Sequence, residues 1–282
     1  MLALGEYHTM IIDRDVSPGL YLRDAEGNEV LLPGKYAPEG FELEDEINVF
    51  VYLDNEERPV ATTLQPYILK NGFAYLECTS VTKIGAFVDW GLDKELFVPF
   101  SNQVTEMREG SWYVIYMYLD ERTNRLVGSS KFNTYLKNEA VDVAKFDKVD
   151  LMVSHFSEFG AHVIINEKYQ GLVHKNTIFE DIRVGDRLPG YIKRVREDNK
   201  IDVLLQPEGY KSVEPNAQFI YDELKRNGGS LPVHDKSSPE DINAYFGISK
   251  KLFKKAIGAL YKDKQIELTP TGIKLTGNSQ ND

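Results

Sequence analysis

The sequence predicts a mostly β protein in which three small barrels follow one another and a small α+β domain ends the chain. Three observations predict this fold class. Short runs of alternating apolar and polar residues, typical of half-buried strands, recur three times. A glycine opens one strand of each copy, as expected where a small barrel bends to close. After Pro207 the alternation gives way to helical spacing.

The three copies are related by fixed offsets. A glycine stands 14 residues before a proline or histidine in each copy, at Gly19 and Pro33, Gly85 and Pro99, and Gly160 and His174. At both anchors the second copy lies 66 residues after the first, and the third lies 141 residues after it. Several anchors with one offset are hard to obtain by chance. We therefore interpret this part of the chain as three β-units of about 65–75 residues each.

The first unit, residues 1–66, is predicted to be an acidic barrel. Its expected strands are residues 8–13, 19–23, 29–32, 47–53 and 60–64. It holds 4 Lys or Arg side chains against 14 Asp or Glu, and a field of that sign repels phosphate. We predict that this copy is structural or faces a protein partner rather than a nucleic acid.

The second and third units repeat the same strand pattern. The second, residues 67–133, has expected strands at 73–81, 85–89, 95–98, 112–119 and 126–130. Residues 134–146 are expected to form a helix that caps this barrel or links it onward, so its domain is taken to end at 146. The third, residues 147–211, has expected strands at 148–155, 160–166, 170–174, 187–196 and 200–206. Five short antiparallel strands with a glycine bend predict a small closed barrel.

Residues 212–282 are predicted to form a winged helix. Helices are expected at 215–227, from Ser238-Pro239 to Tyr245, and from the cap Ser249 to about residue 262. Strands are expected at 230–233, 265–269 and 272–275. Helix, strand, helix, helix, hairpin is the order of this helix-turn-helix variant. The third helix places apolar residues on one side and a lysine stripe on the other, suited to phosphates or simply solvated.

Two motifs of the third unit resemble the S1 RNA-binding domain, an OB-fold barrel. They are Phe159-Gly160-Ala161-His162-Val163 and Gly171-Leu172-Val173-His174. The second unit is similar at 84–88 and 96–99, and the first unit departs further. Three such units followed by a winged helix resemble the bacterial conserved virulence factor B family of YitL-like S1 proteins. The resemblance implies a cytoplasmic RNA-binding protein that affects expression of virulence or stress genes, and it supplies no catalytic activity.

OB barrels bind single strands by stacking bases on aromatic side chains of strands 2 and 3, while basic side chains follow the backbone. The candidate stacking residues are Tyr75, Phe87, Phe97, Phe159, His162 and His174. The candidate phosphate contacts are Lys83, Lys94, Lys168, Lys175, Lys193, Arg194, Arg196, Lys250, Lys251, Lys254 and Lys255. Two alternatives stay open: the phenylalanines pack inside a barrel, and the histidines make structural hydrogen bonds.

Composition limits the other possibilities. The net charge of −11 argues against a protein coated in nucleic acid everywhere, although local patches can still bind. The single Cys78 excludes an intrachain disulfide framework and CxxC zinc sites, and we expect no metal and no cofactor. No apolar run approaches the roughly 18 residues of a membrane span, and the first residues do not resemble a signal peptide. We therefore expect a cytoplasmic protein that does not bind membranes.

Three functional hypotheses follow. The first is a non-catalytic regulator that holds single-stranded RNA on the second and third units, assisted by the lysine helix. The second is a DNA-binding transcription regulator that uses the winged helix. The third is an enzyme, which is disfavoured because the sequence has no Gly-rich phosphate loop, no nucleophile elbow and no HExxH motif.

Overall fold

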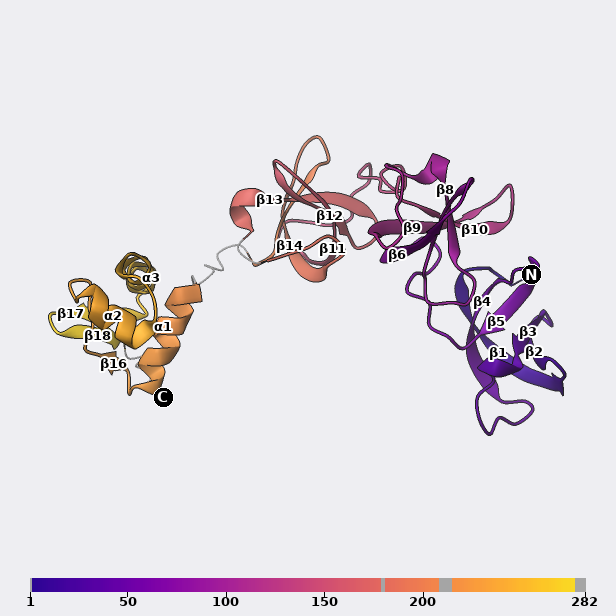
Figure 1. The fold of residues 1–282 in the computed structure, drawn as a ribbon, viewed down its shortest axis with the longest axis horizontal. Helices are drawn as coiled ribbons and strands as arrows, with labels where there is room; N and C mark the ends of the chain where they lie inside the picture. Colours follow the sequence, from indigo (N-terminus) through magenta and orange to yellow (C-terminus); the bar gives the residue numbers. More distant parts are fainter. Residues whose placement is uncertain (1, 179–180, 208–214, 277–282) are drawn as a thin grey trace. The chain divides into compact units, whose positions relative to one another are not determined.

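The computed structural model describes residues 2–178, 181–207 and 215–276 (Figure 1). The chain divides into two compact units, Met1–Glu208 and Gly209–Asp282. Three successive five-stranded sheets build the first unit, and helices with a small sheet build the second. The predicted fold class, mostly β with a terminal winged helix, is confirmed. The predicted domain boundary between residues 211 and 212 lies outside the described residues.

The first sheet closes into a barrel in the order β1-β2-β3-β5-β4. Its strands are β1 (Glu6–Val16), β2 (Gly19–Arg23), β3 (Glu29–Pro33), β4 (Glu46–Leu53) and β5 (Pro59–Thr62). The prediction of five antiparallel strands is wrong at one place, because β3 and β5 pair in parallel. A closed ring with an odd number of strands cannot alternate direction throughout, so one neighbouring pair has to be parallel.

The second sheet has the order β10-β9-β6-β7-β8. Its strands are β6 (Phe73–Val81), β7 (Gly85–Val88), β8 (Leu96–Pro99), β9 (Trp112–Asp120) and β10 (Arg125–Ser129). Its two end strands, β10 and β8, lie side by side. Gly128 of β10 is so close to β8 that a Cβ added to it would come within 2.8 Å of Val98 Cγ2. We call this sheet the second barrel.

The third sheet is again a closed barrel, in the order β11-β12-β13-β15-β14. Its strands are β11 (Lys148–Ser157), β12 (Gly160–Ile165), β13 (Tyr169–His174), β14 (Arg187–Val195) and β15 (Ile201–Leu204). The closing pair, β13 and β15, is parallel as in the first barrel.

The glycine that opens the second strand of each barrel allows two strands to approach closely. A Cβ on Gly160 would lie 2.1 Å from the carbonyl oxygen of Val173, and one on Gly19 would lie 2.2 Å from that of Leu32. No side chain fits at either position. In the third barrel a β-bulge lies in the preceding strand, β11, where the register shifts between Val153 and His155.

Neighbouring barrels of the first unit share apolar contacts. Phe50 and Tyr52 of the first barrel belong to the same buried cluster as Trp90 of the second. Phe73 of the second barrel is buried in one cluster with Met152 of the third. These contacts remove apolar side chains from water, which stabilises the pairing of the barrels.

The helix predicted at residues 134–146 does not form, because this segment consists of turns and extended chain. Its apolar residues serve two different cores: Leu136 packs between the second and third barrels, and Val141 and Val143 pack on the third. Asn138 donates to the carbonyl oxygens of Gln170 and Asn199. Tertiary contacts therefore override the local helical pattern.

The C-terminal unit contains the predicted winged helix. Its elements are α1 (Pro215–Arg226), β16 (Ser230–Leu231), α2 (Pro239–Phe246), α3 (Lys250–Lys262), β17 (Ile266–Thr269) and β18 (Gly272–Leu275). The Ser238 hydroxyl accepts from the Asp241 backbone at 3.0 Å, and Gly247 ends α2 with a φ of 64°. The buried face of α3 includes Phe253 and Leu260. Within the described residues, none of the helices is long and apolar enough to cross a bilayer.

Candidate nucleic-acid interface

The outer face of the third barrel carries a pair of stacked histidines. His155 on β11 pairs in register with His162 on β12, directly after the bulge. Their rings lie 4.2 Å apart and only 7° from parallel. Burial lowers the pKa of both side chains, so both rings are neutral near pH 7. Neutral, flat rings on a sheet surface are suited to stacking against nucleobases.

Cationic side chains surround a buried carboxylate beside this pair. The Asp202 side chain on β15 is only 2% exposed. Arg196 Nη2 donates to its Oδ1 at 2.6 Å, Arg194 Nε donates to its Oδ2 at 2.5 Å, and His174 Nε2 lies 2.9 Å from Oδ1. Burial alone would raise the pKa of Asp202, but hydrogen bonds from Arg196, Arg194 and His174 hold it well below its usual range. Two guanidinium groups share one carboxylate, so the cluster keeps a net positive charge.

The histidine pair and the cation cluster lie on one continuous face. His162 pairs with Leu172 on β13, Leu172 pairs with Asp202, and Asp202 pairs with Arg194. A groove of about 200 Å³ follows this row, lined by His162, Leu172, Arg196, Lys200 and Asp202 among others. Its walls combine a flat ring, apolar surface and cations, which is the combination that single-stranded nucleic acids require.

The remaining candidates of the third barrel lie outside the groove lining, on turns and on β14. The Phe159 side chain is 62% exposed in the turn before β12. Lys175 is exposed directly after His174, and its backbone N–H donates to the Phe159 carbonyl at 2.9 Å. Lys193 is partly buried on β14. Lys168 is exposed and forms an ion pair with Asp142 at 3.3 Å.

The second barrel places Phe87 at the position equivalent to His162, and its partner Phe97 at the position equivalent to Leu172. Phe87 on β7 pairs with Phe97 on β8, with ring centroids 5.2 Å apart, and both rings are partly exposed. They therefore lie on the outer face, not in the barrel core. Lys83 is exposed in the turn that precedes β7.

Two candidates of the second barrel lie at contacts between barrels. Lys94 is partly buried, and its Nζ donates to the Asp54 carbonyl of the first barrel at 2.6 Å. Burial lowers the pKa of Lys94. Tyr75 packs against Trp112 with ring centroids 5.5 Å apart and tilted by 40°, and it lies against Gly185 of the third barrel. The structure thus separates Tyr75 from Phe87.

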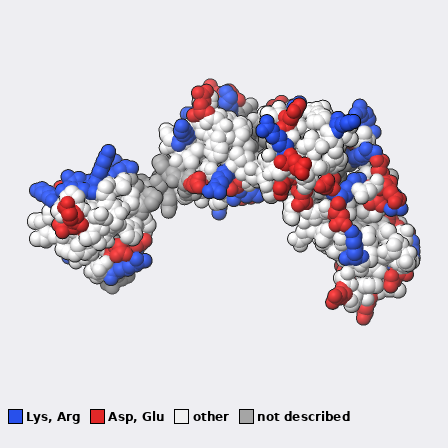
Figure 2. Space-filling model, viewed as in Figure 1, with Lys and Arg blue, Asp and Glu red and all other residues white. Residues whose placement is uncertain are grey.

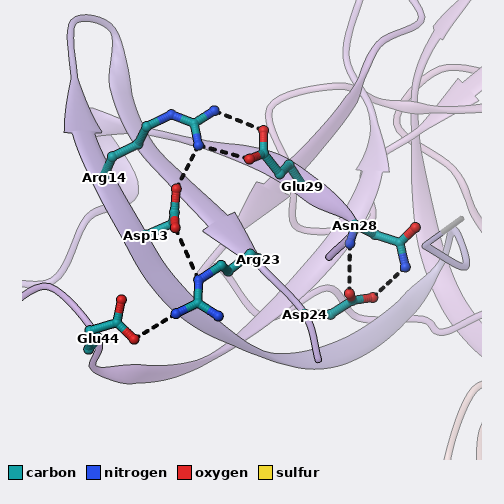
Figure 3. A network of polar contacts seen from close by, with 7 residues as sticks. All are labelled: Asp13, Arg14, Arg23, Asp24, Asn28, Glu29 and Glu44. Atoms are coloured by element: carbon teal, nitrogen blue, oxygen red, sulfur yellow. Dashed lines mark hydrogen bonds and ion pairs between the residues drawn. The ribbon is translucent and has the colours of Figure 1, made fainter. Parts of the chain in front are cut away.

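The first barrel has its basic side chains engaged with carboxylates. At the position of the histidine pair it holds Arg14 over the ring of Tyr21, at 4.4 Å. Figure 3 shows Arg14 bound to Asp13 and Glu29, and Arg23 bound to Asp13 and Glu44. Lys35 pairs with Asp93, and Arg58 pairs with Asp54 and Glu56. Few positive charges remain for phosphate on this barrel.

The lysine stripe of the winged helix follows the exposed side of α3. Lys251, Lys254 and Lys255 are exposed, and Lys250 is partly buried with its Nζ 3.5 Å from the Lys236 carbonyl. Figure 2 shows Lys and Arg side chains gathered over α3. The buried residues of α3 lie on the opposite side, so the predicted amphipathic arrangement is present.

Sequence reasoning missed four residues of the third-barrel face: His155, Ser157, Lys200 and Asp202. Ser157 Oγ lies 3.0 Å from His162 Nε2 and orients that ring. His155 joins the face only through the bulge in β11, which the sequence does not reveal. Asp202 is the one acidic residue within its strand's apolar run, and that position was a usable signal.

Comparisons with known proteins find the same two kinds of domain, a barrel and a winged helix. A family model described as the CvfB-like winged helix domain matches residues 218–275, and an S1 domain model matches residues 4–64. The uncharacterized protein YitL of Bacillus subtilis is 27% identical, over 93% of this chain and 90% of that protein. Conserved virulence factor B of Staphylococcus epidermidis is 29% identical, over 84% of this chain and 82% of that protein.

The resemblance to the conserved virulence factor B family is confirmed. A solved multidomain protein with nucleic acid binding domains from Streptococcus pneumoniae is 27% identical, over 97% of this chain and 98% of that one, with a TM-score of 0.43. The S1 model matches the first barrel, the copy in which the sequence motifs are weakest. S1 and winged-helix domains, with the cationic groove of the third barrel, support a nucleic-acid-binding protein.

Proposed function

We propose that this chain is a non-catalytic, cytoplasmic RNA-binding regulator of gene expression that holds single-stranded RNA on the second and third barrels. The observation that carries the proposal is that the stacked His155 and His162 rings lie on the same outer face of the third barrel as a groove lined by Arg196 and Lys200. Arg194 lies on this face too, opposite Asp202. Bases stack on the rings while the cations contact phosphates. Phe87 and Phe97 supply the stacking surface of the second barrel, and Lys251, Lys254 and Lys255 add cations on α3.

Single strands fit this face better than duplexes do. The groove is formed by strands of one small barrel and is about 200 Å³ in volume. Stacking on a ring requires a base whose face is free, which a duplex does not offer. Acidic side chains on the first barrel disfavour RNA there, and we propose that this barrel contacts the other barrels or a protein partner instead.

The test is binding of the purified full chain to labelled oligonucleotides over a series of salt concentrations. We expect tighter binding to single strands than to duplexes, with the logarithm of affinity falling by about 0.7 per phosphate contact for each tenfold rise in salt. Absent or salt-independent binding contradicts the proposal.

A winged-helix DNA-binding transcription regulator is the second candidate, favoured by the lysines of α3. Preference for duplex DNA that is lost on Lys254→Glu with Lys255→Glu would support it. Lys274→Glu on β18 is the matched control, because it changes an exposed charge by the same amount on a different element of the domain. Few Arg or Asn side chains lie on α3 to read base edges, so sequence-specific DNA binding is the weaker proposal.

A further inference from the structure

A cavity of about 280 Å³ lies between the first and second barrels, within the same compact unit. The β4–β5 hairpin of the first barrel contributes Tyr52, Asn55 and Glu57 to its lining. The second barrel contributes Phe87, Phe97 and Glu95. The aromatic pair of the second barrel is therefore half of a composite site, and the acidic first barrel supplies the other half.

The walls of this cavity are aromatic and held in place. Trp90 is buried between the barrels, edge-to-face with Tyr52 at 6.1 Å and 83° and with Phe50 at 5.8 Å and 74°. Its indole N–H donates to the Lys94 carbonyl, and the Lys94 ammonium donates to the Asp54 carbonyl of the first barrel. The volume lies just below the usual range of ligand pockets, which suits one nucleobase rather than a run of bases.

Polar groups at the rim offer a specific pattern of hydrogen bonds. Glu57 of the first barrel is ion-paired with Arg125 of the second. Glu95 is exposed and makes neither a hydrogen bond nor an ion pair with any other described residue. Its carboxylate accepts two hydrogen bonds and donates none. Guanine is the RNA base that presents two adjacent donors, its ring N1–H and its exocyclic amino group, on one edge.

We propose that this cavity takes one unstacked guanine base from the bound RNA strand. The base enters between Phe87 or Phe97 and the Tyr52 wall, and Glu95 accepts from its donor edge. The inference rests on the proposed RNA-binding function and deepens it, because it gives the second barrel a base preference. It also gives the first barrel a role in RNA binding that its charge alone does not suggest.

The test compares a uridine oligonucleotide with the same oligonucleotide carrying one central guanosine or one central adenosine, by fluorescence anisotropy with the full chain. We expect guanosine to tighten binding about tenfold over both. Glu95→Gln, which replaces an acceptor pair with a donor and an acceptor, should remove that preference and leave uridine binding unchanged. Glu106→Gln, an exposed change outside the cavity, is the matched control and should keep the preference. Asn55→Ala should weaken guanosine binding alone.

The outcomes separate this inference from the proposed function. Equal binding of the three oligonucleotides, or a preference that survives Glu95→Gln, overturns the guanine site and leaves RNA binding in place. Binding of none of them overturns both. Free guanosine monophosphate is added as a competitor at the protein's concentration. If it displaces the oligonucleotide, the cavity belongs to free nucleotides and the assignment to RNA is overturned.

Discussion

The first and third barrels have the same strand order and bulge position, yet they present different chemistry at one equivalent place. Directly after the bulge, the first barrel holds Arg14 over Tyr21 and the third holds His155 on His162. Arg14 is bound to Asp13 and Glu29, whereas the third-barrel guanidinium groups share a single carboxylate. The fold is the platform, and the balance of charges on it determines whether RNA is attracted.

The second barrel lies between these two cases. It keeps an aromatic ring, Phe87, at the position of His162 and Tyr21, but its face is bordered by the first barrel's hairpin. The cations of the first barrel are thus paired with carboxylates, the aromatic pair of the second barrel is enclosed, and the outer face of the third barrel is open.

The largest expected effect is on the stability of the third barrel. Asp202→Ala removes the acceptor of the hydrogen bonds from Arg194 and Arg196, and losing a hydrogen bond to a charged group costs about 2 kcal/mol. Hydrogen–deuterium exchange of peptides from β13 to β15 should therefore accelerate strongly. Glu29→Ala in the first barrel is the control, because its ion pair with Arg14 is exposed and contributes little to stability. A similar acceleration of exchange in the first barrel of Glu29→Ala would show that the two ion-pair clusters contribute equally to stability.

The second prediction concerns acid. Because the folded-state pKa of Asp202 is depressed, its stabilising contribution is complete above the unfolded-state pKa of about 4 and is lost as the pH falls below it. After correction for the intrinsic pH dependence of amide exchange, protection of β13–β15 should fall as the pH drops below about 4. Asp202→Asn should weaken that dependence. An unchanged pH profile in this variant would show that other carboxylates determine acid stability.

The third prediction compares stacking positions. His162→Ala should weaken binding of a single-stranded oligonucleotide about tenfold, because base–ring stacking contributes about 1–3 kcal/mol per base. Tyr21→Ala, at the equivalent position of the first barrel, should leave affinity unchanged. Anisotropy titrations of both variants give the comparison. Equal losses would mean that the first barrel binds RNA on the same face.

The smallest expected effect is on salt dependence. Arg194→Gln should reduce the slope of log affinity against log salt by about 0.7, the value for one phosphate contact on a single strand. Arg58→Gln removes a first-barrel cation that is already paired with Asp54 and Glu56, and the slope should stay as it was. A reduced slope in the Arg58 variant would assign phosphate contact to the first barrel.

Local signals in the sequence predicted most of the fold. The glycine anchors, the alternating strands and the caps Ser238 and Ser249 depend on residues close in sequence, and the structure has them at those places. The helix predicted at residues 134–146 is absent because the apolar residues of this segment are divided between two cores that only the tertiary structure creates.

The candidate site was less predictable for the same physical reason. The outward positions of Phe87 and His162 follow from strand alternation, whereas His155 reaches the face only through a bulge. Lys94 is predicted from sequence to contact phosphate and Tyr75 to stack on a base, but both side chains pack at contacts between barrels. Contacts between tandem domains leave no local pattern, so sequence periodicity could not reveal them.

RNA binding on the second and third barrels is tested most directly by ultraviolet crosslinking of a single-stranded oligonucleotide to the purified full chain, followed by mapping of the crosslinked peptides. We expect crosslinks in residues 155–175 and 83–100, reduced in the third barrel by His162→Ala. Crosslinks confined to the outer face of the first barrel around Tyr21, or to α3 alone, would contradict it.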